Sequence, residues 1–331
     1  MRCRHDNTLQ EARYEALTGF GECPGRCLAV CYKNPPTERK ESGMKTGFIG
    51  LGNLGKAIAR RLIAEETELV VWNRTRQKAE DLGVEITESP AGILSEADTV
   101  FINLVDSDAV TQVITGKDGL LEGDCKGKIV VDTTTNHFDR VLVFHEILKK
   151  HGACYLEAPV LGSVVPASSG KLTVLVSGEK AAYESVKPLL KKIGTNIFYL
   201  EGRTLATKMK LINNLVLGVF MTALAEATVF GEDVGVDKER VLDILSVGAG
   251  NSAVLNAKKE KFQKEDFSPH FSSALIYKDL HYMQDLARSL RRPLFTGSIA
   301  KELFGMTFAK KAASLDLAGV YNIMKEYSES E

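Results

Sequence analysis

The chain has 331 residues, of which 44% are hydrophobic and 26% charged, so it is long enough for two domains with buried cores. Its formal net charge of −1 gives no electrostatic reason to expect a nucleic acid or an anionic membrane as a partner. The N-terminus lacks the continuous apolar segment of a secretory signal, which favours a cytoplasmic protein.

Residues 1–43 differ from the rest of the chain because they contain four of its six cysteines, namely Cys3, Cys23, Cys27 and Cys31. Their spacing matches no common zinc motif and no histidine pair completes it, so we predict no metal site. Met44 directly precedes the first predicted strand. We therefore interpret residues 1–43 as an extension that is disordered or that arises from a non-native start.

Residues 44–75 predict a dinucleotide site. A short apolar strand leads into the turn Gly50-Leu51-Gly52-Asn53-Leu54-Gly55, and a helix and a second strand follow. In this context the first glycine makes a tight turn, the second admits a diphosphate, and the third lets the helix pack on the strand. The alternative is a glycine-rich turn that binds nothing.

The residues after the second strand indicate which cofactor binds. An NAD site usually has an acidic residue here, but this chain reads Asn73-Arg74-Thr75. Arg74 can contact the oxygens of a 2′-phosphate and stack on adenine, and Thr75 adds a hydroxyl donor. The sequence therefore predicts NADP(H), with a solvated loop arginine as the alternative.

Strands and helices alternate up to residue 200, with later strands predicted at 84–86, 99–104, 129–131, 155–158, 172–176 and 197–200, and a helix at 76–82. This pattern predicts an α/β Rossmann-type, doubly wound parallel sheet over residues 44–203. Residues 205–234 read as one long helix of about 45 Å. All later segments are helical, so residues 204–331 are expected to form an all-α domain, with the active site between the two domains.

Four separated segments carry a family resemblance. They are residues 47–55, the segment EAPVLGS at 157–163, the segment KMKLINN at 208–214, and Phe271 with Lys278-Asp279. Their order and spacing resemble the β-hydroxyacid dehydrogenases, the group of 3-hydroxyisobutyrate dehydrogenase and glyoxylate/succinic semialdehyde reductase. The segment WNRT at 72–75 is similar to the NADPH-using reductases in particular. The resemblance implies hydride transfer between NADP(H) and a short carboxylated aldehyde or hydroxy acid.

Lys210 is the predicted general acid and base. Hydride addition to an aldehyde leaves an alkoxide that needs a proton, and a partly desolvated lysine has a lowered pKa that suits this exchange. Asn214 follows one helical turn later on the same face, where it can hold the substrate or the lysine. The alternative is a solvated surface lysine. Lys208 is two residues away and is expected to face elsewhere.

The resemblance also implies further site residues. Thr135 is expected at the nicotinamide half of the cofactor, and Lys278 is expected to reach the cofactor from the helical domain. Asp279 and Phe271 are expected to line the same cleft, although Phe271 could be a core residue and Lys278-Asp279 a pair on a helix surface. Two residues at a strand end are also assigned to the cofactor site: Leu104 and Val105.

The substrate loop departs from the family pattern at Leu161. The family usually has serine there, which helps to hold the substrate carboxylate, whereas Gly162 and Ser163 still offer backbone amides and one hydroxyl. We expect these three residues to contact substrate.

Alternative functions of the chain are a 3-hydroxyisobutyrate dehydrogenase, an imine reductase-like enzyme and a noncatalytic NADP-binding scaffold. Lys210 argues against an imine reductase, because those relatives generally lack a lysine at this position. Lys210 and Asn214 together argue against a scaffold, which has no need of both. The substrate, the reaction direction and a homo-oligomeric state are left open.

Overall fold

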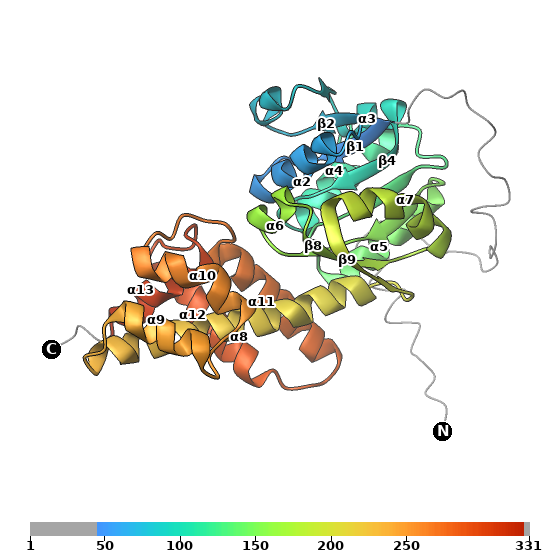
Figure 1. Ribbon diagram of the computed structural model, residues 1–331. Coiled ribbons are helices and arrows are strands. Elements are labelled where there is room, and N and C mark those ends of the chain that lie inside the picture. Colours follow the sequence, from blue (N-terminus) through green and yellow to red (C-terminus); the bar gives the residue numbers. More distant parts are fainter. Residues whose placement is uncertain (1–44, 328–331) are drawn as a thin grey trace.

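The computed structural model describes residues 45–327, so the predictions for residues 1–43 and their cysteines lie outside the described residues. Figure 1 shows one lobe built on a β-sheet and a second lobe built from helices. Helix α8 (Leu205–Asp233) runs from the first lobe into the second. The expected class, a Rossmann-type domain followed by a helical domain with a long connecting helix, is confirmed.

Six strands of the sheet lobe run parallel to one another, in the order β3-β2-β1-β4-β5-β6. Because β1 lies between β2 and β4, the chain turns outward in both directions from it, which creates a topological switch point at the carboxyl ends of the strands. The bounds of these strands are β1 Lys45–Ile49, β2 Leu69–Trp72, β3 Glu85–Ile86, β4 Ala97–Ile102, β5 Ile129–Asp132 and β6 Cys154–Glu157.

Helices cover both faces of this sheet, which explains why its strands are nearly continuous runs of apolar residues. One buried cluster contains side chains of α2, α6 and α7, and the other contains side chains of α3, α4 and α5. The bounds are α2 Asn53–Ala64, α3 Pro90–Glu96, α4 Ser107–Thr115, α5 Phe138–Lys150, α6 Val164–Ser168 and α7 Lys180–Ile193.

The sheet is mixed rather than wholly parallel at its far edge. Strand β8 (Leu172–Ser177) is antiparallel to β6 and to β7 (Val160–Leu161), and β9 (Gly194–Leu200) is parallel to β8. Ten residues separate β7 from β8, fewer than the dozen or more that the crossover of a parallel pair requires. The parallel sheet that was predicted is therefore mixed at this edge, and the two-residue strand β7 was not predicted.

The predicted helix at residues 76–82 is also wrong. Two short 3₁₀ turns, Arg76–Lys78 and Glu80–Leu82, occupy this segment. Thr75 provides no side-chain cap, and the first turn carries two basic residues, which oppose the positive end of a helix.

The helical lobe packs around α8. Helices α11, α12 and α13 lie against α8, and their apolar side chains form a buried core with those of α9 and α10. A smaller cluster of Phe138, Leu211, Met283 and Leu286 joins α5 of the sheet lobe to α8 and α11. The remaining bounds are α9 Lys238–Val247, α10 Ala253–Lys264, α11 Ser273–Ser289, α12 Phe295–Ala309 and α13 Val320–Lys325.

Candidate active site

The three glycines of the turn after β1 have different reasons to be glycine. Gly50 has a φ of +97°, and a Cβ there would collide with the carbonyl oxygen of Asn103. A Cβ on Gly55 would collide with the carbonyl oxygen of Gly50. At Gly52, by contrast, a Cβ would meet no atom within 4 Å. Gly50 and Gly55 are thus required by the fold, while Gly52 leaves open space beside the backbone.

That open space lies at the N-terminus of α2. Its N-cap residue, Gly52, provides no side-chain cap, and its first turn contains no acidic residue. Unpaired amides and the positive end of a helix dipole suit a diphosphate. The turn residue Leu51 and the first helical residues Asn53 and Leu54 therefore fit a dinucleotide.

Asn73 connects this loop to the end of β2. Its Oδ1 accepts a hydrogen bond of 2.8 Å from the amide of Leu51, and its Nδ2 donates to the carbonyl of Thr75 at 2.8 Å. Arg74 and Thr75 are exposed. Arg76 pairs with Glu88 at 2.9 Å, whereas no ion pair within residues 45–327 involves Arg74. The Arg74 guanidinium is therefore available to a phosphate.

The ends of β4 and β5 are tied together by hydroxyl groups. The amide of Leu104 donates to Thr134 Oγ1 at 3.0 Å, and Asn103 Nδ2 donates to Thr133 Oγ1 at 2.9 Å. Strand β4 ends at Ile102 rather than at residue 104, so Leu104 lies in the loop, where Val105 is 55% exposed. Both predicted cofactor residues thus lie just beyond a strand end.

Lys210 is 8% exposed and faces the interior together with Asn214, which is fully buried. Burial is the main cause that lowers the pKa of Lys210 to about 8; Asp279 opposes the shift, and Lys278 adds to it. Within residues 45–327 the Lys210 ammonium group makes no hydrogen bond or ion pair. Lys208 faces elsewhere, as predicted, with its Nζ 5.6 Å from the centre of the Phe138 ring.

Asp279 links the two halves of this site. It is 1% exposed, and its Oδ2 accepts a hydrogen bond of 2.6 Å from Asn214 Nδ2. Lys278 Nζ lies 3.1 Å from Asp279 Oδ1 and donates to the carbonyl oxygen of Thr135 at 2.8 Å. Four predicted residues from α8, α11 and the loop after β5 therefore form one network. The burial of Asp279 rules out a pair on a helix surface.

The substrate-loop residues form a second group. Leu161 is half-buried on β7, and Gly162 has a φ of +124° that favours glycine. Ser163 Oγ donates to the carbonyl oxygen of His270 at 3.2 Å. The next residue, Phe271, is half-buried against the core of the helical lobe, so part of its side chain serves packing. No hydrogen bond or ion pair in the described part of the chain joins this group to Lys210.

Three polar residues near the site were not assigned a role from sequence. Thr133 and Thr134 belong to a run of threonines at a strand end, a signal that could have indicated their roles. Glu157 accepts hydrogen bonds from the amides of Thr204 and Thr207 at the start of α8. No local signal could have indicated this, because its partners lie about 50 residues further along the chain.

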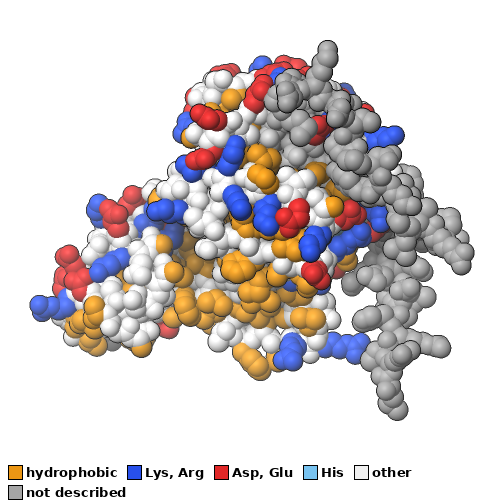
Figure 2. Space-filling view, turned by 45° about the vertical axis from the view of Figure 1, so that its right-hand side comes forward, with side chains coloured by type: hydrophobic (Ala, Val, Ile, Leu, Met, Phe, Trp, Pro, Cys, Tyr) orange, Lys and Arg blue, Asp and Glu red, His pale blue; other side chains and the backbone are white. Residues whose placement is uncertain are grey.

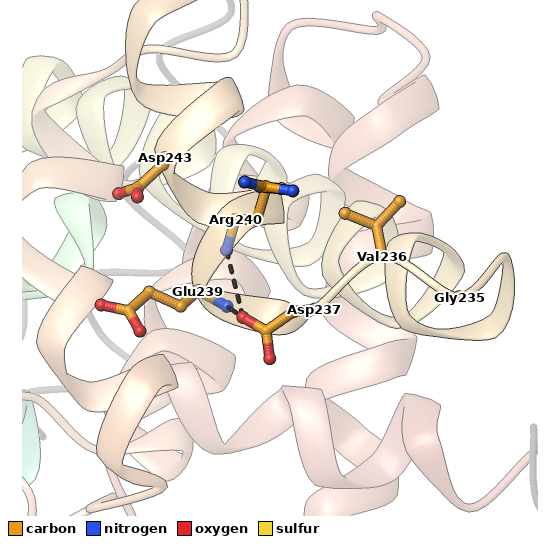
Figure 3. A pocket seen from close by; sticks show the side chains of 6 residues that line it. All are labelled: Gly235, Val236, Asp237, Glu239, Arg240 and Asp243. Carbon is orange, nitrogen blue, oxygen red and sulfur yellow. Dashed lines mark hydrogen bonds between the residues drawn. The ribbon is translucent and has the colours of Figure 1, made fainter.

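A surface hollow lies at the turn between α8 and α9 (Figure 3), after the end of α8 that is remote from Lys210. Asp237 caps α9 there by accepting from the amides of Glu239 and Arg240 at 3.0 and 3.4 Å. These bonds satisfy a helix start, so we assign the hollow no role in the reaction. It is lined by Gly235, Val236, Asp237, Glu239, Arg240 and Asp243.

A Rossmann-type sheet with an open glycine turn, an unpaired arginine after β2 and a buried lysine on the connecting helix define an NADP-dependent dehydrogenase. Comparisons with known proteins agree. Residues 45–202 match the family described as the NAD-binding domain of 6-phosphogluconate dehydrogenase. Residues 205–324 match the family described as NAD-binding of NADP-dependent 3-hydroxyisobutyrate dehydrogenase.

Individual relatives point the same way. The chain is 30% identical to glyoxylate/succinic semialdehyde reductase 2, chloroplastic, of Arabidopsis thaliana, over 96% of this chain and 92% of that protein. It is similar in structure to a 3-hydroxyisobutyrate dehydrogenase from Salmonella typhimurium, with a TM-score of 0.79 and 26% identity over 85% and 99% of the two chains.

A third relative is the cytokine-like nuclear factor N-PAC of Homo sapiens, 30% identical over 86% of this chain but only 51% of that protein. The chain belongs to the β-hydroxyacid dehydrogenase family. It is an NADP-dependent oxidoreductase that acts on hydroxyl or aldehyde groups.

Proposed function

We propose that the chain reduces a short carboxylated aldehyde, of the glyoxylate or succinic semialdehyde type, with NADPH as hydride donor and Lys210 as general acid. The observation that carries the proposal is the Lys210 ammonium group, which is buried, has no hydrogen-bond partner in residues 45–327 and has a pKa lowered to about 8. Burying a charged group without a partner costs stability, which is expected where the partner is a substrate.

When bound, NADPH would supply a hydride to the carbonyl carbon. Lys210 then delivers a proton to the oxygen that becomes an alkoxide, and in the reverse direction the neutral amine removes that proton. Asp279 holds the amide of Asn214 in one orientation beside the lysine. We assign the substrate carboxylate to the backbone amides of Gly162 and Ser163. The half-buried Leu161 would border the rest of the substrate.

The residues proposed to hold NADP(H) come from four loops at the carboxyl ends of the strands and from α11. The glycine loop would hold the diphosphate, Arg74 and Thr75 the 2′-phosphate, and the residues after β4 and β5 the nicotinamide half. They are Gly50, Leu51, Gly52, Asn53, Leu54, Gly55, Asn73, Arg74, Thr75, Leu104, Val105, Thr135 and Lys278.

The test is an NADPH-oxidation screen over glyoxylate, succinic semialdehyde, methylmalonate semialdehyde and apolar aldehydes. Lys210→Ala is expected to lower kcat by roughly two to four orders of magnitude, the usual contribution of a positioned proton donor. Lys208→Ala is the matched control, because its side chain lies over Phe138. Normal turnover in Lys210→Ala would contradict the proposal, and turnover of apolar aldehydes alone would change the substrate class.

We further propose that the chain pairs with a second copy of itself through α8. Five apolar residues, spaced by four, three, four and four positions, are each 40–46% exposed along this helix: Leu205, Met209, Ile212, Val216 and Phe220. In Figure 2, hydrophobic side chains gather in the band of the molecule that α8 crosses in Figure 1, since the two views share the same vertical axis. Apolar residues spaced by three or four positions form the line of contact between paired helices. A line of contact without charged residues can pack against the same surface of a second copy related by a two-fold axis.

Helix α8 is also long and apolar enough to cross a membrane by length and composition, but 44% of its most apolar window is buried inside the protein. We favour the second copy because the opposite face of α8 carries Lys210 and Asn214. Light scattering after size exclusion should give a dimer or a higher even state, and Ile212→Glu with Val216→Glu should give a monomer. A monomeric unmutated protein would contradict the pairing.

A further inference from the structure

The first turn of α8 is held by side chains of the sheet. Glu157 accepts hydrogen bonds from the amide of Thr204 and, at 2.8 Å, from the amide of Thr207. Ser177 Oγ accepts from the amide of Ala206 at 3.0 Å. Glu157 and Ser177 are almost fully buried and face each other across the antiparallel pair β6–β8. The first amides of a helix have no partner within it, so these two side chains fix its start to the sheet.

The residues at the start of α8 do not by themselves stabilise the backbone conformation found there. Thr204 precedes the helix with a φ of +67°, and its side chain makes no capping hydrogen bond. A β-branched residue rarely adopts this left-handed conformation, so the surrounding contacts must hold it there. The negative charge of the Glu157 carboxylate also interacts favourably with the positive end of the helix dipole. His145 Nε2, from α5, lies 3.6 Å from the same carboxylate.

The hydrogen bonds that Glu157 and Ser177 accept from the start of α8 lie close to Lys210, the proposed proton donor. Lys210 follows Thr207 by three residues, a rise of about 4.5 Å along the helix axis. Glu157 is also the last residue of β6, four positions before Leu161 of the substrate loop. A single side chain thus links the origin of the substrate loop to the helix that carries the proton donor.

We infer that Glu157, assisted by Ser177, is a positioning residue that sets the distance of Lys210 from the strand ends where the nicotinamide half of the cofactor is proposed to bind. The inference rests on the proposed function. A displacement of about 1 Å in a reacting group can cost about a hundredfold in rate, so the hold on α8 matters for turnover beyond its contribution to stability.

Glu157→Gln tests the inference with little change in shape. Glutamine has one acceptor oxygen for two amide donors, and its own amide group would oppose the second donor. We expect kcat to fall about tenfold, with the substrate KM and the NADPH Kd within about twofold of the unmutated values. Ser177→Ala should also lower kcat while the KM and the NADPH Kd stay unchanged. The loss in kcat should be smaller, about threefold, because this substitution removes one neutral hydrogen bond.

Asp237→Ala is the matched control. It removes a carboxylate that accepts from two amides at the start of a helix (Figure 3), but that helix is α9, which follows the end of α8 remote from Lys210. It should lower Tm and leave kcat unchanged. Hydrogen exchange supplies a readout independent of turnover: the amides of residues 204–210 should exchange faster in Glu157→Gln than in the unmutated protein, and those of α9 should not.

Two results would overturn the inference. One is a Glu157→Gln protein with a lowered Tm and an unchanged kcat, as for Asp237→Ala. The other is unchanged exchange over residues 204–210. Lys210→Ala is assayed in parallel. If it is inactive while Glu157→Gln turns over normally, the proposed function stands and the inference is wrong. If Lys210→Ala is fully active, the proposed function is wrong and the inference falls with it.

Discussion

Lys278 donates a hydrogen bond of 2.8 Å to the backbone carbonyl of Thr135 and so joins α11 of the helical lobe to the end of β5. The same ammonium group lies 3.1 Å from Asp279 Oδ1. The charges of both residues act on Lys210, since Asp279 raises its pKa and Lys278 lowers it. The link between the lobes is therefore also part of the electrostatic environment of the proposed proton donor.

The pH dependence of turnover should report the titration of Lys210. Its pKa is lowered to about 8, so the protonated form that reduction requires prevails below pH 8. We expect kcat for reduction to be constant below about pH 8 and to fall about tenfold per pH unit above it. Oxidation of the hydroxy acid requires the neutral amine and should rise over the same range. A reduction rate that is flat from pH 7 to 10 would contradict this assignment.

Substitutions beside Lys210 should move this pKa in opposite directions. Lys278→Met removes a neighbouring positive charge and should shift the midpoint of the pH profile upward. Asp279→Asn removes a negative charge and should shift it downward. The measurement is kcat against pH for both variants, with Lys301→Met as a control for a buried lysine of α12. Shifts of the same sign in the two site variants would show that another group titrates.

Removal of Lys210 should stabilise the protein while it abolishes turnover. The pKa of this group is lower in the folded protein than the ordinary value of 10.5, so its charged form destabilises the fold below pH 8. Lys210→Met should raise the free energy of unfolding at pH 7 by at most about 3 kcal/mol. The gain should shrink as the pH rises from about 8 to 10.5. Urea unfolding at pH 7 and pH 10 checks this, and Lys208→Met should show no such gain.

Arg74 should account for most of the preference for NADPH over NADH. A charge-assisted contact contributes roughly 1.5–3 kcal/mol, so Arg74→Ala should weaken NADPH binding by about ten- to a hundredfold with little effect on NADH. Arg76→Ala is a suitable control, because Arg76 already pairs with Glu88. Titration of both cofactors by fluorescence is the measurement. Equal affinities of the unmutated protein for the two cofactors would refute the role of Arg74.

Leu161→Ser should improve the reduction of small carboxylated aldehydes. The new hydroxyl can donate to the carboxylate, which contributes about 1 kcal/mol to kcat/KM. Bulkier apolar aldehydes should not benefit, because they lose contact area with the leucine. The comparison requires kcat/KM for both substrate classes. If activity on every carboxylate falls, Leu161 itself shapes the pocket for the native substrate.

Local pattern was sufficient for the elements that depend on neighbouring residues. The turn Gly50–Gly55 between an apolar strand and a helix predicts a dinucleotide fold because its chemistry lies within about 30 residues. The spacing of Lys210 and Asn214 predicts a shared helix face, since side chains four residues apart meet on a helix. The structure places both of these side chains in the interior. The long helix α8 could be predicted for the same reason.

The antiparallel edge of the sheet and the hydrogen bonds around the site depend on contacts between segments that are distant in the sequence. The antiparallel edge at β8 depends on which strand it meets, and the strand β7 is only two residues long. The hold of Glu157 on Thr207 spans 50 positions, and the bond from Lys278 to Thr135 spans 143. A carboxylate at a strand end has the same local sequence pattern whether it faces water or the start of a helix. Only the packing of α8 against the sheet determines which of the two it meets, and so how the buried charge of Lys210 is held.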